Sequence, residues 1–293
     1  MTDTAGTTES RHTGSTVIPR HADYDSNAAV PAAAALIRQR LEHSRRFRAR
    51  HPGHLDIPYG PLPANKWDIY PAADPTAPCL AFVHGGYWQR NDRQGFATVA
   101  EGLHAHGWSV ALPGHTLAPE ASLTRIVAEI RAAIGWLARH GDDHGAAGPI
   151  VVSGWSSGAH LISLALDLPG VIGGLAVSGV YELRPLTETG FGAALALTPD
   201  EIAGLSPLHR PVGDTTPLTV AYGTAELPAL IGDSAALHAH RIAAGAPSRL
   251  LPVEGADHFT ILEEFRRPGG VLVGAALDIV RAHRHQSGDS ARS

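Results

Sequence analysis

A serine flanked by glycines stands between a predicted buried strand and a predicted helix. The segment Gly154-Trp155-Ser156-Ser157-Gly158 follows the apolar run 149–153 and precedes a helical pattern over 158–167. In that context a Gly-x-Ser-x-Gly turn holds its serine on a tight strand-to-helix turn with the hydroxyl exposed. Glycines suit such a turn because the backbone passes too close to its neighbours to leave room for a Cβ atom. Ser156 is therefore a candidate nucleophile, and the alternative is a purely structural Gly-Ser turn.

A second glycine-rich segment could stabilise the negative charge that such a nucleophile creates. His84-Gly85-Gly86-Tyr87-Trp88 directly follows the apolar run 79–83. Adjacent glycines at the end of a strand let backbone N–H groups approach an oxygen closely, which is how an oxyanion hole forms. The residue after the nucleophile usually completes it. The expected donors are the N–H groups of Gly85, Gly86, Tyr87 and Ser157, and the alternative is a Gly-Gly hairpin turn.

A serine hydroxyl also needs a base, and His258 is the candidate. It lies in Gly255-Ala256-Asp257-His258-Phe259, after the last predicted strand. A serine is a poor nucleophile at neutral pH, so an imidazole within reach must take its proton and return it to the leaving group. The chain order serine, acid, histidine is that of hydrolases with a nucleophile elbow.

The acid that orients the imidazole should follow the strand predicted at 218–222. Glu226 is the first carboxylate after that strand, and Asp233, the next, falls inside a predicted helix. Glu226 is therefore the expected acid and Asp233 the alternative. Asp257 is adjacent to His258 in sequence and is expected to fix the loop.

These residues need a scaffold that brings distant loops to one edge of a sheet, and the periodicity predicts one. Apolar runs predict strands at 66–70, 79–83, 108–112, 149–153, 174–178, 218–222 and 249–253. Helical patterns cover 31–50, 94–106, 123–140, 158–167, 199–205, 229–244 and 271–282. Alternating strands and helices favour an α/β fold with a mainly parallel central sheet covered by helices on both faces.

The remaining segments are expected to be peripheral. Residues 1–23 and 286–293 are predicted as disordered tails around a single domain at 24–285. In the helix at 31–50, Leu36, Ile37 and Leu41 are expected to face the core, with a solvated basic opposite side. The pattern loosens at 181–217, where an insertion or cap could cover a site at the strand ends.

Composition limits the classes of function. The chain has 293 residues, 44% of them hydrophobic, and a net charge of -5 with scattered basic residues, which argues against nucleic-acid or membrane partners. A single cysteine, Cys79, excludes an intramolecular disulfide and fits a reducing, cytoplasmic location. The expected partner is a small-molecule substrate, an aromatic amide or ester, and a homodimer is left open.

No cofactor or metal is expected. Histidine pairs such as His104 and His106 are two residues apart, so on a helix they face different directions. Neither a His-Glu-x-x-His motif nor a dinucleotide or phosphate-binding loop is present.

The chain resembles the alpha/beta-hydrolase superfamily and, within it, the kynurenine formamidase (arylformamidase) group of the hormone-sensitive-lipase-like branch. The resemblance covers roughly residues 22–284 and is most specific in the His-Gly-Gly-Tyr-Trp-Gln run. The matching segments are 24–31, 58–61, 84–89, 117–119, 158–161, 178–183 and 257–259. Two positions depart from the group: Trp155 stands where His is common, and Glu226 where Asp is frequent.

The resemblance implies hydrolysis of N-formylkynurenine to kynurenine and formate, with Ser156 as nucleophile, Glu226 as acid and His258 as base. Aromatic side chains could line a slot for the leaving group, and Trp88, Trp155 and Tyr181 are the expected substrate contacts. Three alternatives stay open: a carboxylesterase acting on short acyl esters, a tailoring hydrolase or acyltransferase of a secondary pathway, and a binding protein that has lost activity.

Overall fold

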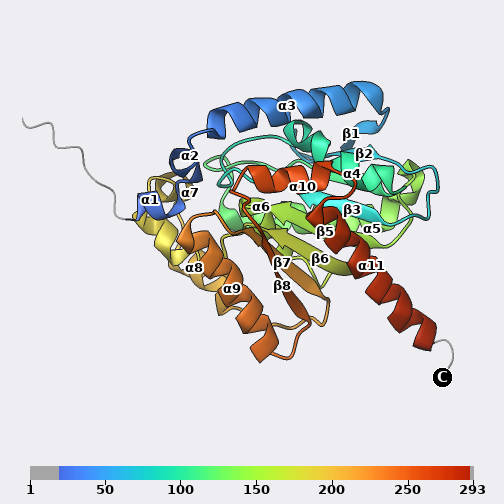
Figure 1. The fold of residues 1–293 in the computed structure, drawn as a ribbon. Helices are drawn as coiled ribbons and strands as arrows, with labels where there is room; N and C mark the ends of the chain where they lie inside the picture. Colours follow the sequence, from blue (N-terminus) through green and yellow to red (C-terminus); the bar gives the residue numbers. More distant parts are fainter. Residues whose placement is uncertain (1–19, 291–293) are drawn as a thin grey trace, which may run out of the picture.

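The central feature of the fold is an eight-stranded sheet with the order β1-β2-β4-β3-β5-β6-β7-β8 (Figure 1). Strands β1 and β2 pair antiparallel, β2 pairs antiparallel with β4, and all later pairs are parallel. We describe residues 20–290 from a computed structural model. The strands are β1 (His54–Pro58), β2 (Lys66–Tyr70), β3 (Cys79–Val83), β4 (Ser109–Pro113), β5 (Ile150–Trp155), β6 (Val171–Val177), β7 (Leu218–Gly223) and β8 (Ser248–Val253).

Helices cover both faces of this sheet. The α-helices are α1 (His21–Tyr24), α2 (Ser26–Ala29), α3 (Ala33–Arg50), α4 (Ala100–Ala105), α5 (Leu123–His140), α6 (Ser157–Ser163), α7 (Gly192–Leu195), α8 (Pro199–Leu205), α9 (Pro228–Ala243), α10 (Glu263–Arg266) and α11 (Val271–Ser290). Short 3-10 helices are η1 (Gln94–Val99), η2 (Asp142–His144), η3 (Arg184–Glu188), η4 (Pro207–His209) and η5 (Thr260–Leu262). None of the helices in the part that we describe combines the length and the hydropathy needed to cross a bilayer.

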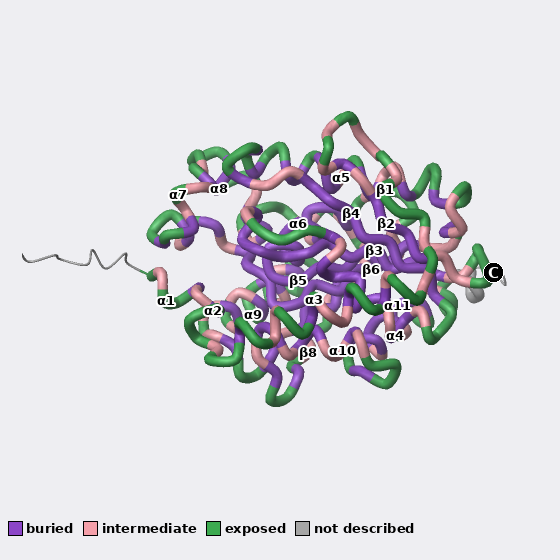
Figure 2. The backbone as a smooth tube through the Cα atoms, turned by 90° about the horizontal axis from the view of Figure 1, so that it is seen from above, coloured by how far each residue is buried: buried purple, intermediate pink, exposed green. Residues whose placement is uncertain are grey.

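Two apolar cores lie on opposite faces of the sheet. In β3, Ala81 belongs to the core under α5, α6, α8 and α9, whereas Leu80 and Phe82 belong to the core under α3, α4, α10 and α11. Successive strand residues point to opposite faces, and both faces are covered, so every residue of β3, β4 and β5 is buried. The buried strands therefore lie at the centre of the molecule, with exposed segments around them (Figure 2). The predicted fold class is confirmed.

The main difference from the sequence-based expectation is an additional edge strand. Residues 54–58 pair with β2 in a register that is irregular between His54 and Ile57, and Asp56 has a φ of 58°. A proline at one end and this irregularity break the alternation by which strands are recognised. Strand β1 is therefore stabilised by pairing that the local sequence does not signal.

The boundaries of the expected tails also differ. Residues 1–19 and 291–293 lie outside the described residues, but α1 begins at His21, within the predicted tail 1–23. The His21 ring stacks on Phe191 and its Nδ1 accepts the N–H of Gly190 at 3.1 Å, so tertiary contacts order this segment. At the other end α11 continues to Ser290, past the predicted boundary at 286, because the packed part of the helix can be propagated one hydrogen bond at a time.

Of the three apolar residues expected on the core face of α3, Leu36 and Ile37 are partly buried against the core, and only Leu41 was assigned incorrectly. Arg40, Ser44 and Phe47 are buried, whereas Leu41 is 46% exposed. The spacing 40, 44, 47 is that of one helix face. The buried stripe therefore includes an arginine and a serine, and the position next to Leu41 that faces the core is occupied by Arg40.

The predicted insertion at 181–217 folds into η3, α7, α8 and η4. Its helix α8 begins with a capping box between Thr198 and Glu201. Phe191 of the insertion stacks face to face on Tyr87, with ring centroids 3.8 Å apart. The insertion thus packs directly against the glycine-rich segment that follows β3.

Candidate functional site

Ser156 lies on the turn between β5 and α6, as the sequence predicts. Its backbone has a φ of 57° and a ψ of -122°, a conformation that non-glycine residues rarely adopt. The N–H of Ser156 donates to Val177 O at 2.8 Å, which fixes the turn to β6. Strained backbone of this kind persists only where the surroundings hold it, and such residues cluster at functional sites.

The flanking glycines of this turn are required by backbone packing. A Cβ atom on Gly158 would lie well inside van der Waals contact with Val83 O, and one on Gly154 would collide with the backbone of Gly158. We expect Gly158→Ala to lower the free energy of unfolding by about 2 kcal/mol or more. The control is Gly274→Ala in α11, where a Cβ would meet nothing within 4 Å and which should gain about 0.5–1 kcal/mol. Urea unfolding of both variants measures the difference, and equal effects would contradict the packing argument.

The glycine-rich segment 84–91 forms a tight loop beside Ser156. Gly86, Tyr87 and Trp88 have successive positive φ values of 132°, 56° and 58°. The Trp88 N–H donates to Ser157 Oγ at 3.3 Å, and Asn91 Nδ2 donates to Gly85 O at 2.8 Å. These bonds hold the loop against the start of α6.

Of the four expected oxyanion donors, three are placed to bind an oxyanion and one, Gly85, is not. Within residues 20–290 the N–H groups of Gly86 and Tyr87 donate to no protein acceptor, and both residues line the cavity that contains Ser156. Ser157 is the first residue of α6, where a backbone N–H has no partner inside the helix. Gly85 lies one residue behind the cavity wall and packs against the Trp155 backbone. An oxyanion site at Gly86, Tyr87 and Ser157 thus has donors that are not already used.

His258 and Glu226 come together from two neighbouring strands. His258 follows β8, Glu226 follows β7, and His258 Nδ1 lies 3.5 Å from Glu226 Oε2. The other carboxylate oxygen, Oε1, accepts from the Ser178 hydroxyl and from the Gly223 N–H. Catalytic hydrogen bonds are often long without substrate, so this separation suits a base and the acid that orients it.

The two other carboxylates considered from the sequence have different partners. Asp233 accepts the N–H of Tyr181 at 2.8 Å and of Glu182 at 3.4 Å. Burial raises the pKa of Asp233 to about 6. Asp257 Oδ1 accepts the N–H groups of Phe259 and Thr260, both at 2.8 Å, so it fixes the loop that carries His258. Of the three carboxylates, Glu226 is the one that faces the imidazole.

Trp155 links the nucleophile turn to the base. Its indole Nε1 donates to His258 O at 2.8 Å, and the two rings lie 4.7 Å apart. It is 4% exposed and lines the cavity. The residue before Ser156 therefore gives the His258 loop a direct hydrogen bond.

Ser156 and His258 line one cavity with a volume of about 90 Å³. Its remaining walls come from α2, α3 and the glycine-rich loop, with Ser26, Asn27, Ile37, Arg40, Arg90 and Asn91 among them. Sites for drug-sized ligands usually hold about 300 Å³ or more. In this conformation the cavity has room for a small acyl group and part of its leaving group.

Two expected substrate contacts were wrong. Trp88 and Tyr181 are 1% and 0% exposed, belong to the apolar core and do not line this cavity. Trp88 packs edge-on against His160. The sequence shows that an aromatic residue lies near the site, but it does not show whether the side chain points into the core or into the cavity. The sequence analysis did not identify Arg40 and Asn27, which line the cavity, or Ser178, which bonds to Glu226. For Arg40, its spacing from Ser44 and Phe47 on one face of α3 was a signal that could have been used.

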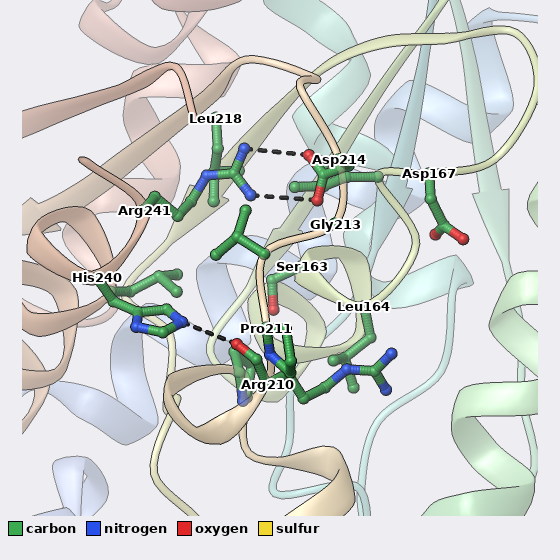
Figure 3. A pocket seen from close by; sticks show the side chains of 14 residues that line it. Ser163, Leu164, Asp167, Arg210, Pro211, Gly213, Asp214, Leu218, His240 and Arg241 are labelled. Carbon is green, nitrogen blue, oxygen red and sulfur yellow. Dashed lines mark hydrogen bonds and ion pairs between the residues drawn. The ribbon is translucent and has the colours of Figure 1, made fainter. Parts of the chain in front are cut away.

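A second cavity, of about 220 Å³, lies elsewhere (Figure 3). Leu218 is the first residue of β7 and Asp167 follows α6, so this cavity lies at the amino ends of the parallel strands, whereas Ser156 lies at their carboxyl ends. Arg241 forms an ion pair with Asp214 there, and His240 bonds to the backbone of Arg210. This cavity is larger than the one beside Ser156, but neither Ser156 nor His258 lines it, so it is not the candidate active site. Among the described residues no three His, Cys, Asp or Glu side chains gather to hold a metal ion.

Buried histidines around the site make the fold sensitive to acid. Burial lowers the pKa of His84 to about 3 and that of His160 to about 4. Since both values lie below that of an unfolded histidine, about 6.5, each contributes stability above pH 6.5 that is lost as the pH falls.

As the pH falls, we expect each buried imidazole to lower the free energy of unfolding by up to about 1.4 kcal/mol per pH unit between about pH 6 and 4.5. Asp233, with its raised pKa, opposes one such contribution over the same range. His160→Gln should remove one such contribution and give a shallower slope. Urea unfolding of both proteins from pH 7.5 to 4.5 measures this. Stability that is flat or rises with acid, or an unchanged slope in the variant, would contradict the assignment.

The sheet order, the covering helices and the serine turn after β5 define the alpha/beta-hydrolase fold, and the protein is a hydrolase of that class. A model of the BD-FAE family matches residues 67–168, which contain the glycine-rich loop and Ser156.

Relatives by sequence include two fish kynurenine formamidases. The Danio rerio protein is 26% identical over 244 residues, which is 77% of this chain and 81% of that protein. The Salmo salar protein is 26% identical over 241 residues, 76% of this chain and 80% of that protein.

Similar solved structures include a protein described as a thioesterase, from a Silicibacter species. It has a TM-score of 0.79 and 27% identity, and the alignment covers 88% of this chain and 98% of that one. A phosphonate-inhibited esterase B from Lactobacillus rhamnosis has a TM-score of 0.71 and 18% identity, covering 92% and 100%. This second likeness supports the fold.

Proposed function

We propose that the protein is a serine hydrolase that cleaves an aryl formamide, N-formylkynurenine, to kynurenine and formate, a reaction of tryptophan breakdown. The observation that carries the proposal is the meeting of Ser156 and His258 in one cavity, with Glu226 facing the far side of the imidazole. The similarity to kynurenine formamidases supports the choice of substrate.

In the proposed mechanism Ser156 attacks the formyl carbonyl while His258 takes the hydroxyl proton. The oxyanion is held by the backbone N–H groups of Gly86, Tyr87 and Ser157. His258 then gives its proton to the leaving arylamine, and Glu226 stabilises the imidazolium that forms between these steps. Water enters, loses a proton to His258 and attacks the formyl ester. His258 then returns that proton to the Ser156 oxygen as formate leaves.

The dimensions of the site also suit this reaction. A formyl group is the smallest acyl group, which suits a cavity of about 90 Å³. Trp155 and Phe259 line the same cavity and offer aromatic surface to the leaving group. The cytoplasmic location expected from the sequence stays a prediction.

A carboxylesterase acting on short acyl esters is the second candidate, and the esterase structures that share the fold favour it. Side-by-side kinetics on N-formylkynurenine and p-nitrophenyl acetate separate the two. We expect the larger kcat/KM on the formamide. A far larger value on the ester would remove the formamidase proposal and leave the esterase.

A further inference from the structure

The charge of the candidate active site is opposite to that of the whole protein. The chain has a net charge of -5. The cavity with Ser156 and His258 is lined by two arginines, Arg40 and Arg90, and by no aspartate or glutamate. A cleft of one sign with low-dielectric walls attracts ligands of the opposite charge.

Arg40 is the more unusual of the two because it is buried without a partner. It is 7% exposed, its Nε is buried, and within the described residues no hydrogen bond or ion pair reaches its guanidinium. Asp92 acts on it through space, but that carboxylate caps the backbone N–H of Gly95 at 2.8 Å. A buried charge normally has a partner, since desolvation without one is costly.

The neighbours of Arg40 hold it in place without neutralising it. Its guanidinium carbon lies 3.9 Å from the centre of the Phe96 ring and 5.9 Å from that of Trp155. Stacking of this kind stabilises an arginine while its N–H donors stay free. Burial lowers the pKa of Arg40 to about 10, so it remains charged at neutral pH.

Three other arginines on the same helix have carboxylate partners. Arg45 and Arg46 pair with Glu42, and Arg48 pairs with Asp68. These partners come from α3 itself, in Glu42, and from β2, in Asp68. Arg40 differs from these three residues in lining the cavity and in lacking a carboxylate.

We infer that Arg40 is the carboxylate-binding group of the catalytic cavity, so that the preferred substrate is an aryl formamide or ester whose leaving group carries a carboxylate. This inference rests on the proposed function for the position of the scissile bond. The acyl side of a formamide is a hydrogen atom, so the charged group must belong to the leaving part. The planar guanidinium can give two parallel N–H bonds to that carboxylate.

The test compares substrates that differ in one substituent, which is a charged carboxylate in one and a neutral amide in the other. 2-Formamidobenzoate and 2-formamidobenzamide have the same scissile bond and nearly the same shape. We expect kcat/KM to favour the benzoate by on the order of 10- to 100-fold. In Arg40→Met that ratio should fall toward one, with Arg90 left as the remaining cationic side chain of the cavity. Arg38→Met is the matched control, because Arg38 is exposed on the same helix and its loss removes the same charge from outside the cavity; its ratio should match the unmodified protein.

Additional experiments distinguish failure of the formamidase proposal from failure of the inference about Arg40. If the formamides are not cleaved, the formamidase proposal fails. The esters 2-acetoxybenzoate and 2-acetoxybenzamide then measure the preference for the anion in ester hydrolysis, so the inference about Arg40 is still tested. The dissociation constants of the two formamides from the Ser156→Ala variant measure the preference for the charged ligand without turnover. Should Arg40→Met not fold, Arg40→Lys keeps the charge but loses the two-point fork, and its ratio should fall by on the order of 10-fold. No preference for the anion in the unmodified protein, or an unchanged ratio in Arg40→Met or Arg40→Lys, overturns the inference.

Discussion

Ser156→Ala is expected to lower kcat by at least about 10³-fold while the protein stays folded. Removal of the hydroxyl abolishes the covalent step, and the activity that remains comes from the oxyanion donors and substrate positioning. The thermal midpoint should change little, because alanine tolerates the backbone of Ser156 as well as serine does and the side chain forms no bond in the core.

Ser163→Ala is the matched control for this variant. Ser163 lies at the end of α6, and its hydroxyl donates to His160 O at 2.7 Å, away from the catalytic cavity. We expect its kcat within about threefold of the unmodified value. A Ser156→Ala protein that is folded and retains more than about a tenth of the rate would contradict a nucleophilic Ser156.

Glu226→Gln should have the second largest effect, lowering kcat by about 10²- to 10⁴-fold. A neutral amide cannot stabilise the imidazolium, and its NH2 group can turn toward His258 Nδ1 and favour the wrong tautomer. Its position would change little, since the N–H of Gly223 and the hydroxyl of Ser178 can still bond to the amide oxygen at Oε1. The measurement is steady-state kcat on the best substrate of the formamide and ester panel.

Asp233→Asn is the control for the acid assignment. Asparagine keeps an oxygen to accept the N–H groups of Tyr181 and Glu182, so the loop should be retained and kcat should stay within about tenfold. If Asp233→Asn caused the large loss and Glu226→Gln a small one, the acid role would pass to Asp233.

Much of the fold could be predicted because many of its elements have strong local signals. The helix at Leu123–His140 and the strand at Lys66–Tyr70 have the predicted bounds, since amphipathic periodicity and alternation are clear there. Strand β1 was missed because its stability comes from pairing with β2. In α3, Leu41 was placed on the core face in error because the polar residues Arg40 and Ser44 occupy that buried face.

For the site, the sequence predicted positions along the chain better than it predicted which side chains face the cavity. Ser156, Glu226 and His258 follow the ends of β5, β7 and β8, so strand order alone brings them to one edge of the sheet. Whether Trp88 faced the cavity or the core depended on the path of a loop with three successive positive φ values. Such a path depends on tertiary contacts that no short segment encodes.

The most direct test of a covalent serine mechanism is to treat the folded protein with a fluorophosphonate and map the adduct by peptide mass spectrometry. The account predicts one stoichiometric adduct on Ser156, lost in Ser156→Ala and much slower to form in His258→Ala. Folded protein that does not react, or that carries the adduct on another residue, would contradict it.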